Sequence, residues 1–164
     1  MDDSPHIIRT KEIPWTPLKE GTRFEYLRKR MSLGAGGKEI GCSIFRVPPG
    51  KSAFPAHRHF HNEEAYYILE GEGILRYGEK RVPITAGDYV ALPARGPAHQ
   101  LIGGEANELV YLCISTNFGI EIAEYPDSKK IGVLVEGQGT SDPKAREFFK
   151  LFREGDEVGY YDGE

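Results

Sequence analysis

Glycine and proline punctuate this chain at short intervals along its whole length. Gly (20) and Pro (11) together make 31 of the 164 residues, about 19%, where an average protein has about 12%. Because they are spread out rather than clustered, they leave room only for short regular segments separated by tight turns. The pattern favours an all-β sandwich or barrel over a bundle of long helices.

The apolar runs between these turn residues have the length of β-strands. Ile40–Val47, for example, ends at Pro48-Pro49-Gly50, a turn sequence that a strand cannot continue through. Ile13–Pro17 should be extended, because each proline disfavours the helical conformation in the residue before it, and Ser32–Gly37 should form a loop. The predicted strands are Phe24–Met31, Ile40–Val47, Ala65–Leu69, Ile74–Tyr77, Arg81–Thr85, Tyr89–Leu92 and Leu109–Ser115.

The length of 164 residues is typical of one domain and sufficient for a core that needs no disulfide or structural metal. We expect a single domain over 1–164, with an N-terminal extended arm at 1–34, a barrel core at 35–125 and a C-terminal extension at 126–164.

One helix is predicted in the C-terminal extension, at about 143–154. Asp142 suits the N-cap, Pro143 the first helical position and Gly155 the residue after the end. Apolar side chains recur at helical spacing on one face: Ala145, Phe148, Phe149 and Phe152. We expect this face to pack over the outside or the mouth of the barrel, with an aromatic contact in a dimer as the alternative.

Charge and hydropathy exclude several classes of partner. Lys+Arg 21 and Asp+Glu 25 give a net charge of −4, and a chain without a basic block lacks the electrostatic footprint of a nucleic-acid binder. The longest apolar run, Leu109–Ile114, is six residues, far short of the roughly 20 that span a bilayer. Met1–Pro5 has neither the charged nor the apolar region of a signal peptide, and Cys42 and Cys113 lie in apolar runs typical of reduced thiols. We therefore expect a cytoplasmic protein with no nucleic-acid and no membrane partner.

Histidine is concentrated in one short segment. His57, His59 and His61 are three of the five histidines, and Glu63 and Glu64 follow after one further residue. Residues two apart on a strand share a face, so His57 and His59 can present both imidazoles to one point. A carboxylate from the following loop and a third imidazole from a distant strand would complete a metal site with open positions for water or substrate. A His-x-His pair also occurs on solvated strands without a metal, so the flanking residues must distinguish a metal site from a solvated pair.

The flanking residues resemble the two sequence motifs of the cupin superfamily. The first motif, G…HxH…E…G, is matched by Gly50, His57-Arg58-His59, Glu64 and Gly71. The second motif, G…PxG…H, is matched by Gly87, Pro93, Gly96 and His99. One extra residue precedes His57 and another lies between Pro93 and Gly96, and both fall in turns, where insertions are tolerated. The likeness extends over roughly residues 35–125.

This resemblance implies a double-stranded β-helix, or jelly-roll, barrel with a metal inside. The implied ligands are His57, His59, Glu64 and His99, and the six-residue run to Gly71 selects Glu64 over Glu63. His61 is expected at the rim or in contact with a ligand. The implied cofactor is a divalent transition metal, and His and Glu ligands suit Zn, Fe, Mn, Ni and Cu alike.

Small single-domain cupins resemble the mannose-6-phosphate isomerase-like group, which implies a sugar-phosphate isomerase acting on a small polar metabolite. A metal-dependent dioxygenase and a non-enzymatic binding or sensor cupin are the alternatives. Strand parity places Tyr66, Ile68 and Leu101 on the metal-facing side. Tyr66 and Glu63 are the candidate catalytic residues, although Tyr66 equally suits a buried core position.

Two further expectations concern partners. An anionic group of a ligand could be bound by any of four arginines, and the sequence favours none of them: Arg46, Arg58, Arg76 and Arg95. Cupins commonly pair through barrel edges, and burial of exposed edge strands in the N-terminal arm predicts a homodimer.

Overall fold

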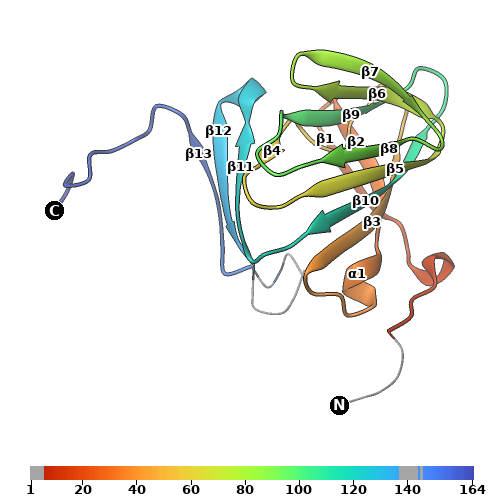
Figure 1. The fold of residues 1–164 in the computed structure, drawn as a ribbon, viewed down its shortest axis with the longest axis horizontal. Coiled ribbons are helices and arrows are strands. Elements are labelled where there is room, and N and C mark those ends of the chain that lie inside the picture. The colour runs from red at the N-terminus through yellow and green to blue at the C-terminus, as the bar shows by residue number, and fades with distance from the viewer. Residues whose placement is uncertain (1–5, 137–143, 145) are drawn as a thin grey trace.

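The computed structural model describes residues 6–136, 144 and 146–164. This part of the chain is almost entirely antiparallel β-structure, arranged in three hydrogen-bonded sheets (Figure 1). A six-stranded sheet has the order β1-β2-β3-β10-β5-β8, a three-stranded sheet the order β7-β6-β9, and a four-stranded sheet the order β13-β12-β11-β4. The expected all-β jelly-roll fold is confirmed.

The strands follow the predicted runs closely within the barrel, and β3 and β8 have the predicted bounds. In chain order the elements are η1 (Thr10–Glu12), β1 (Thr16–Glu20), β2 (Phe24–Arg30), α1 (Met31–Gly34), β3 (Ile40–Val47), β4 (Arg58–His59), β5 (Glu64–Glu70), β6 (Glu72–Tyr77), β7 (Lys80–Thr85), β8 (Tyr89–Leu92), β9 (His99–Gly103), β10 (Leu109–Thr116), β11 (Ile120–Tyr125), η2 (Pro126–Ser128), β12 (Lys130–Val135) and β13 (Phe148–Arg153).

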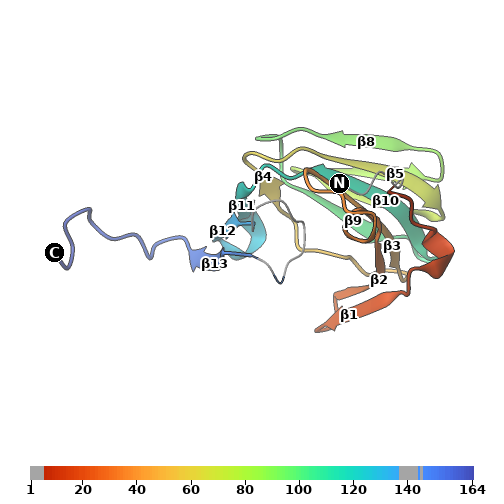
Figure 2. The same cartoon turned by 90° about the horizontal axis from the view of Figure 1, so that it is seen from below.

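The N-terminal arm is built into the six-stranded sheet. Strand β2 pairs with β3, and β1 pairs with β2 at the edge of the sheet, where Figure 2 shows it projecting from the barrel. The extended conformation expected around the prolines of Ile13–Pro17 is present. The predicted loop at Ser32–Gly37 instead begins with the single helical turn of α1.

The core lies between the barrel walls. Its most deeply buried side chains are Val47, Phe45, Ile68 and Leu109, which come from three neighbouring strands of the six-stranded sheet. Phe45 stacks on Tyr111 with ring centroids 5.2 Å apart, so aromatic contacts fill the interior. Ile68 is buried on the predicted inner face, as are Tyr66 and Leu101.

The predicted helix at 143–154 is wrong over the residues that the structure describes. Residues 148–153 form the strand β13, which pairs with β12 from Val135↔Phe148 to Lys130↔Arg153. Pairing with a neighbouring strand overrides the helical spacing of the aromatic residues, because Phe is also a good strand former. Asp142, Pro143 and Ala145, on which the helix prediction also relied, lie outside the described residues.

The four-stranded sheet stands against one end of the barrel, as Figure 1 shows for β11, β12 and β13. It is joined to the histidine segment because β4 pairs with β11, with His59 opposite Ala123. This sheet therefore places C-terminal residues over the mouth of the barrel.

Candidate metal centre

Backbone pairing brings distant histidines together. His57 and His99 form an isolated antiparallel bridge, in which each backbone N–H donates to the carbonyl of the other residue at 3.1 and 2.8 Å. His59 follows two residues later on β4, and its ring centroid lies 5.0 Å from that of His57. The three imidazoles therefore face one point, as strand parity and the second motif predicted.

Glu64 completes the cluster from the first position of β5. Its Oε2 lies 3.1 Å from Nε2 of His99, 3.6 Å from Nε2 of His59 and 3.9 Å from Nε2 of His57. One ligand atom from each of these four residues lies within 4.8 Å of the other three. Three imidazole nitrogens and one carboxylate oxygen at such spacing fit a divalent transition metal.

The imidazole of His57 is held in the tautomer that a metal ligand needs. Its Nδ1 lies 2.8 Å from the carbonyl oxygen of Pro55, and since a carbonyl can only accept, Nδ1–H donates. Nε2 then carries the free lone pair toward the cluster. Burial lowers the pKa of His57 to about 4, so the ring is neutral at pH 7.

His59 lies between two carboxylates. Its Nε2 is 3.6 Å from Glu64 and its Nδ1 is 3.6 Å from Oε2 of Glu121. These contacts are longer than hydrogen bonds, and both ring nitrogens are buried without a hydrogen-bond partner. Burial acts to lower the pKa of His59, but Glu121 and Glu64 outweigh burial and raise the pKa to about 10. Positive charge is thus favoured between these carboxylates, and a bound cation would supply it while giving Nε2 a partner.

The Glu64 carboxylate is ionised and oriented. Burial acts to raise its pKa, but the imidazoles of His59 and His99 outweigh burial and hold the pKa well below its usual range. The hydroxyl of Tyr66 donates to Oε2 at 2.9 Å. Burial and the Glu64 carboxylate raise the pKa of Tyr66 well above its usual value, so this hydroxyl stays protonated and orients Glu64.

Glu121 is a residue of this site that the sequence did not reveal. It lies on β11 with 3% of its surface exposed, and its carboxylate accepts hydrogen bonds from the backbone N–H groups of Phe60, His61 and Asn62 at 3.0, 3.2 and 2.6 Å. Burial acts to raise its pKa, but His59 and the N–H of Asn62 outweigh burial and lower it. Glu121 therefore fixes the loop after β4 and the ring of His59 at once.

Two candidates lie apart from the cluster. His61 is exposed at the rim, where its Nδ1 lies 3.0 Å from the carbonyl of Ile120 and its ring packs on Phe118. Glu63 is exposed, and its backbone N–H donates to Oγ1 of Thr116. Because successive side chains on an extended chain point to opposite faces, Glu63 faces away from Glu64, and the structure does not bring it to the candidate centre.

A cavity of about 330 Å³ opens next to the cluster, here named the inner cavity. His57, His59 and Glu64 line it together with Arg28, Phe54 and Phe149. Phe149 comes from β13, so the C-terminal strand forms part of the wall. Apolar walls with a few polar groups are typical of a small-molecule site.

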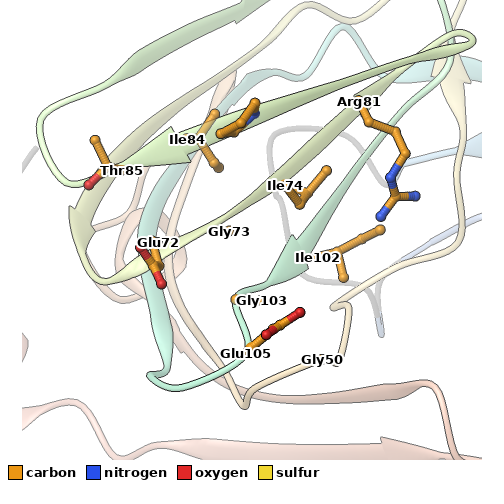
Figure 3. A pocket seen from close by; sticks show the side chains of 12 residues that line it. Gly50, Glu72, Gly73, Ile74, Arg81, Ile84, Thr85, Ile102, Gly103 and Glu105 are labelled. Atoms are coloured by element: carbon orange, nitrogen blue, oxygen red, sulfur yellow. The ribbon is translucent and has the colours of Figure 1, made fainter.

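A second cavity, of about 540 Å³, lies on the β7-β6-β9 sheet and is named the outer cavity (Figure 3). Ile74 pairs with Pro83 on one side and Ile102 on the other, so these three side chains share a face. The neighbouring Leu75 points into the core, which places the three on the outer face. Arg81 also lines this cavity.

None of the four arginines considered from the sequence lines the inner cavity. Arg46, Arg58 and Arg76 pair with Glu108, Glu124 and Asp127, respectively. Arg95 donates from Nε to the backbone carbonyl of Phe60. The arginines of the inner cavity are instead Arg28 and Arg146.

Comparison with known proteins agrees with this architecture. Residues 43–115 match the family model for the cupin domain. Over this segment the chain is similar to cupin domains. The segment contains all four residues of the cluster, and the barrel strands from most of β3 to most of β10 lie within it.

Two solved structures resemble nearly the whole chain. A proposed sugar phosphate isomerase from Acidithiobacillus ferrooxidans is 22% identical, with a TM-score of 0.78, over 94% of this chain and 96% of its own. A cupin-superfamily sugar phosphate isomerase from Silicibacter pomeroyi is 20% identical, with a TM-score of 0.75, over 94% and 97%. At these identities the likeness shows the fold.

A curated relative is more similar over a shorter stretch. The oxalate-binding protein of Thermotoga maritima is 38% identical over 69 residues, which are 42% of this chain and 55% of the relative. The chain spans about half the length of the curated relatives it matches. Among the described residues, none of the helices has the length and apolar character that a membrane crossing requires.

Proposed function

We propose that the protein is a metal-dependent cupin enzyme of the sugar-phosphate isomerase type, acting on a small polar metabolite. His57, His59, Glu64 and His99 would bind one divalent transition metal. The observation that carries the proposal is the convergence of three imidazole nitrogens and one carboxylate oxygen beside a cavity of about 330 Å³. When bound, the metal supplies a Lewis acid that polarises a substrate carbonyl or hydroxyl.

The other residues of the site have supporting roles in this proposal. Tyr66 holds Glu64 through its hydroxyl, and Glu121 orients His59. The wall from β13, which includes Phe149, restricts access of water to the reacting atoms. The proposal gives no catalytic role to Glu63, and Tyr66 is a positioning residue because its hydroxyl stays protonated.

The comparisons support this choice among cupin activities. The two structures named for sugar phosphate isomerases match 94% of this chain each, so their likeness includes the strands that cover the mouth of the barrel.

The test begins with elemental analysis of the protein purified without added metal, followed by anaerobic assays of aldose–ketose conversion on a panel of sugar phosphates. We expect about one metal ion per chain and conversion that stops when a chelator is added. His99→Ala should abolish both, and Arg81→Ala, in the outer cavity, should change neither. Oxygen uptake with iron bound would point to a dioxygenase and overturn the isomerase assignment.

Non-enzymatic binding of a dicarboxylate is a second candidate, because the curated relative described above is named an oxalate-binding protein. Tight oxalate binding by the metal-loaded protein, without turnover of any sugar phosphate, would favour this candidate.

We further propose that the protein is a homodimer. All five residues of β1, an edge strand of the six-stranded sheet, are exposed, and β13, an edge strand of the four-stranded sheet, exposes Phe149, Leu151 and Phe152. Exposed edges of this kind favour association with another chain. Light scattering after size-exclusion chromatography should give the mass of two chains, and the mass of one chain would contradict the proposal.

A further inference from the structure

Resting on the proposed metal centre, we propose that Arg28 binds an anionic group of the ligand, either a phosphate or a carboxylate, while other oxygens of the same ligand face the metal. Arg28 would then be the residue that selects anionic over neutral metabolites.

Arg28 lies on the inner face of the barrel. It stands two residues after the buried Tyr26 on β2, and its register partner on β3 is the buried Phe45. Since paired residues and residues two apart share a face, the side chain is directed inward. It lines the inner cavity together with His57, His59 and Glu64.

The guanidinium of Arg28 is held in one orientation. Its Nε donates to Oγ of Ser43 at 3.0 Å, and its central carbon lies 5.0 Å from the ring centroid of Phe45. The two terminal nitrogens are left to bind other groups. A planar, fixed fork of this kind matches the oxygens of a carboxylate or phosphate.

No carboxylate neutralises Arg28 among the described residues, whose ion pairs include Arg46, Arg58, Arg76 and Arg146. Burial, together with the positive charge of Arg30, lowers the pKa of Arg28. A partly buried cation without a counter-charge is costly, and an anionic ligand would offset that cost.

The balance of charges around the inner cavity also favours an anionic ligand. Arg146 also lines the cavity, but Oε1 of Glu136 lies 3.2 Å from its Nε. The carboxylates of Glu64 and Glu121 would balance a divalent metal. Arg28 then remains as the one uncompensated charge of the described lining, so the loaded site attracts an anion.

The experiment measures binding of inorganic phosphate and of oxalate to metal-loaded protein by calorimetry at constant ionic strength. Arg28→Gln should weaken the binding of at least one of these anions by about 10- to 100-fold and leave metal content unchanged. Arg28→Lys, which keeps the charge but not the fork, should recover part of the affinity. Arg81→Ala is the matched control and should bind as the wild type does.

The outcomes separate the two proposals. Loss of phosphate binding alone identifies a phosphate ester as the ligand class, and loss of oxalate binding alone identifies a carboxylate. Wild-type affinity for both anions in a folded, metal-loaded Arg28→Gln would overturn the role of Arg28 but not the metal centre. A wild-type protein that takes up no metal would overturn the metal centre, and the anion titrations on that protein would still test Arg28. If Arg28→Gln does not fold, Arg28→Lys decides, and unchanged affinity for both anions then counts against the proposal.

Discussion

The outer cavity has the larger volume, whereas the inner cavity has the side chains that could carry out chemistry. The outer cavity is the larger, at about 540 Å³ against about 330 Å³, and Figure 3 shows Ile74, Ile102, Glu72 and Glu105 among its lining side chains. The inner cavity holds the cluster of His57, His59 and Glu64. Volume therefore does not identify the functional site of this fold, whereas convergence of polar atoms in a buried place does.

The two cavities also differ in what their side chains require. In the inner cavity, the nitrogens of His59 are buried without hydrogen-bond partners, so the site is incomplete without a ligand atom. In the outer cavity, Arg81 is exposed and water can satisfy its guanidinium. Substitutions in the two places should consequently have very different effects.

The largest effect is expected from removal of an imidazole of the cluster. His99→Ala should lower metal affinity by more than about 100-fold, because changes even to the groups behind a ligand cost about 10- to 100-fold. Elemental analysis after dialysis against metal-free buffer measures the change. His61→Ala is the matched control, since His61 is exposed and its side chain contacts a rim carbonyl and Phe118 rather than the cluster. Metal loss in His61→Ala with retention in His99→Ala would show that the cluster is assigned wrongly.

Metal removal should lower stability without unfolding the chain. The core around Phe45, Val47, Ile68 and Leu109 does not include the cluster, so the metal-free protein should keep its β-sheet circular dichroism. A metal at about 100 times its Kd adds about 2.7 kcal/mol, or roughly 5–10 °C in Tm for a domain of this size. Thermal scans with and without chelator measure this shift, which should be absent in His99→Ala. Collapse of the wild type on chelation would instead make the metal structural.

A smaller effect is expected from the carboxylate behind His59. Glu121→Gln keeps the shape of the side chain but removes the charge beside Nδ1 of His59, so metal affinity should fall by about 10- to 100-fold. Glu124→Gln is the matched control on the same strand, because Glu124 pairs with Arg58 and does not contact the cluster. Competition with a chromophoric chelator gives both affinities, and equal values would exclude an orienting role for Glu121.

How far the sequence could predict the structure differs between these regions. The strands and turns of the barrel could be predicted from apolar runs and turn residues. The bounds of β3 and β8 were predicted correctly because each is an apolar run that ends at turn residues and pairs within a regular sheet. The cluster followed from strand parity and motif spacing. Glu121 did not, because β11 inverts the usual pattern: Glu121 is 3% exposed, whereas the adjacent Ile120 is 59% exposed. Only the three-dimensional pairing of β11 with β4 puts that carboxylate beside His59.

The prediction of a helix in the C-terminal extension was wrong for a related reason. Phe148, Phe149 and Phe152 fit a helical period, but the same residues are good strand formers, and local spacing does not record that β12 offers an edge to pair with. Arg28 was overlooked because charged residues on both faces of β2 hide its inward direction. Its spacing from Tyr26 was the available signal.

The smallest effect is expected on the outer side of the molecule. Arg76 shares the outer face of β6 with Ile74, and its Nη1 and Nη2 donate to Asp127 at 2.5 and 2.8 Å. The Arg76 guanidinium lowers the pKa of Asp127, so the pair stabilises the folded state above the ordinary carboxyl pKa of about 3.9 and loses that contribution as pH falls through the lower folded-state value. Because both side chains are partly exposed, the contribution should be below about 1 kcal/mol. Asp127→Asn should therefore lower the free energy of unfolding slightly at pH 7, and the difference from wild type should shrink as the pH falls below the ordinary carboxyl pKa. Urea titrations at pH 7, 5 and 3 measure this difference in the free energy of unfolding. A decrease at pH 7 as large as the one caused by metal removal would contradict the contrast between the outer and inner regions.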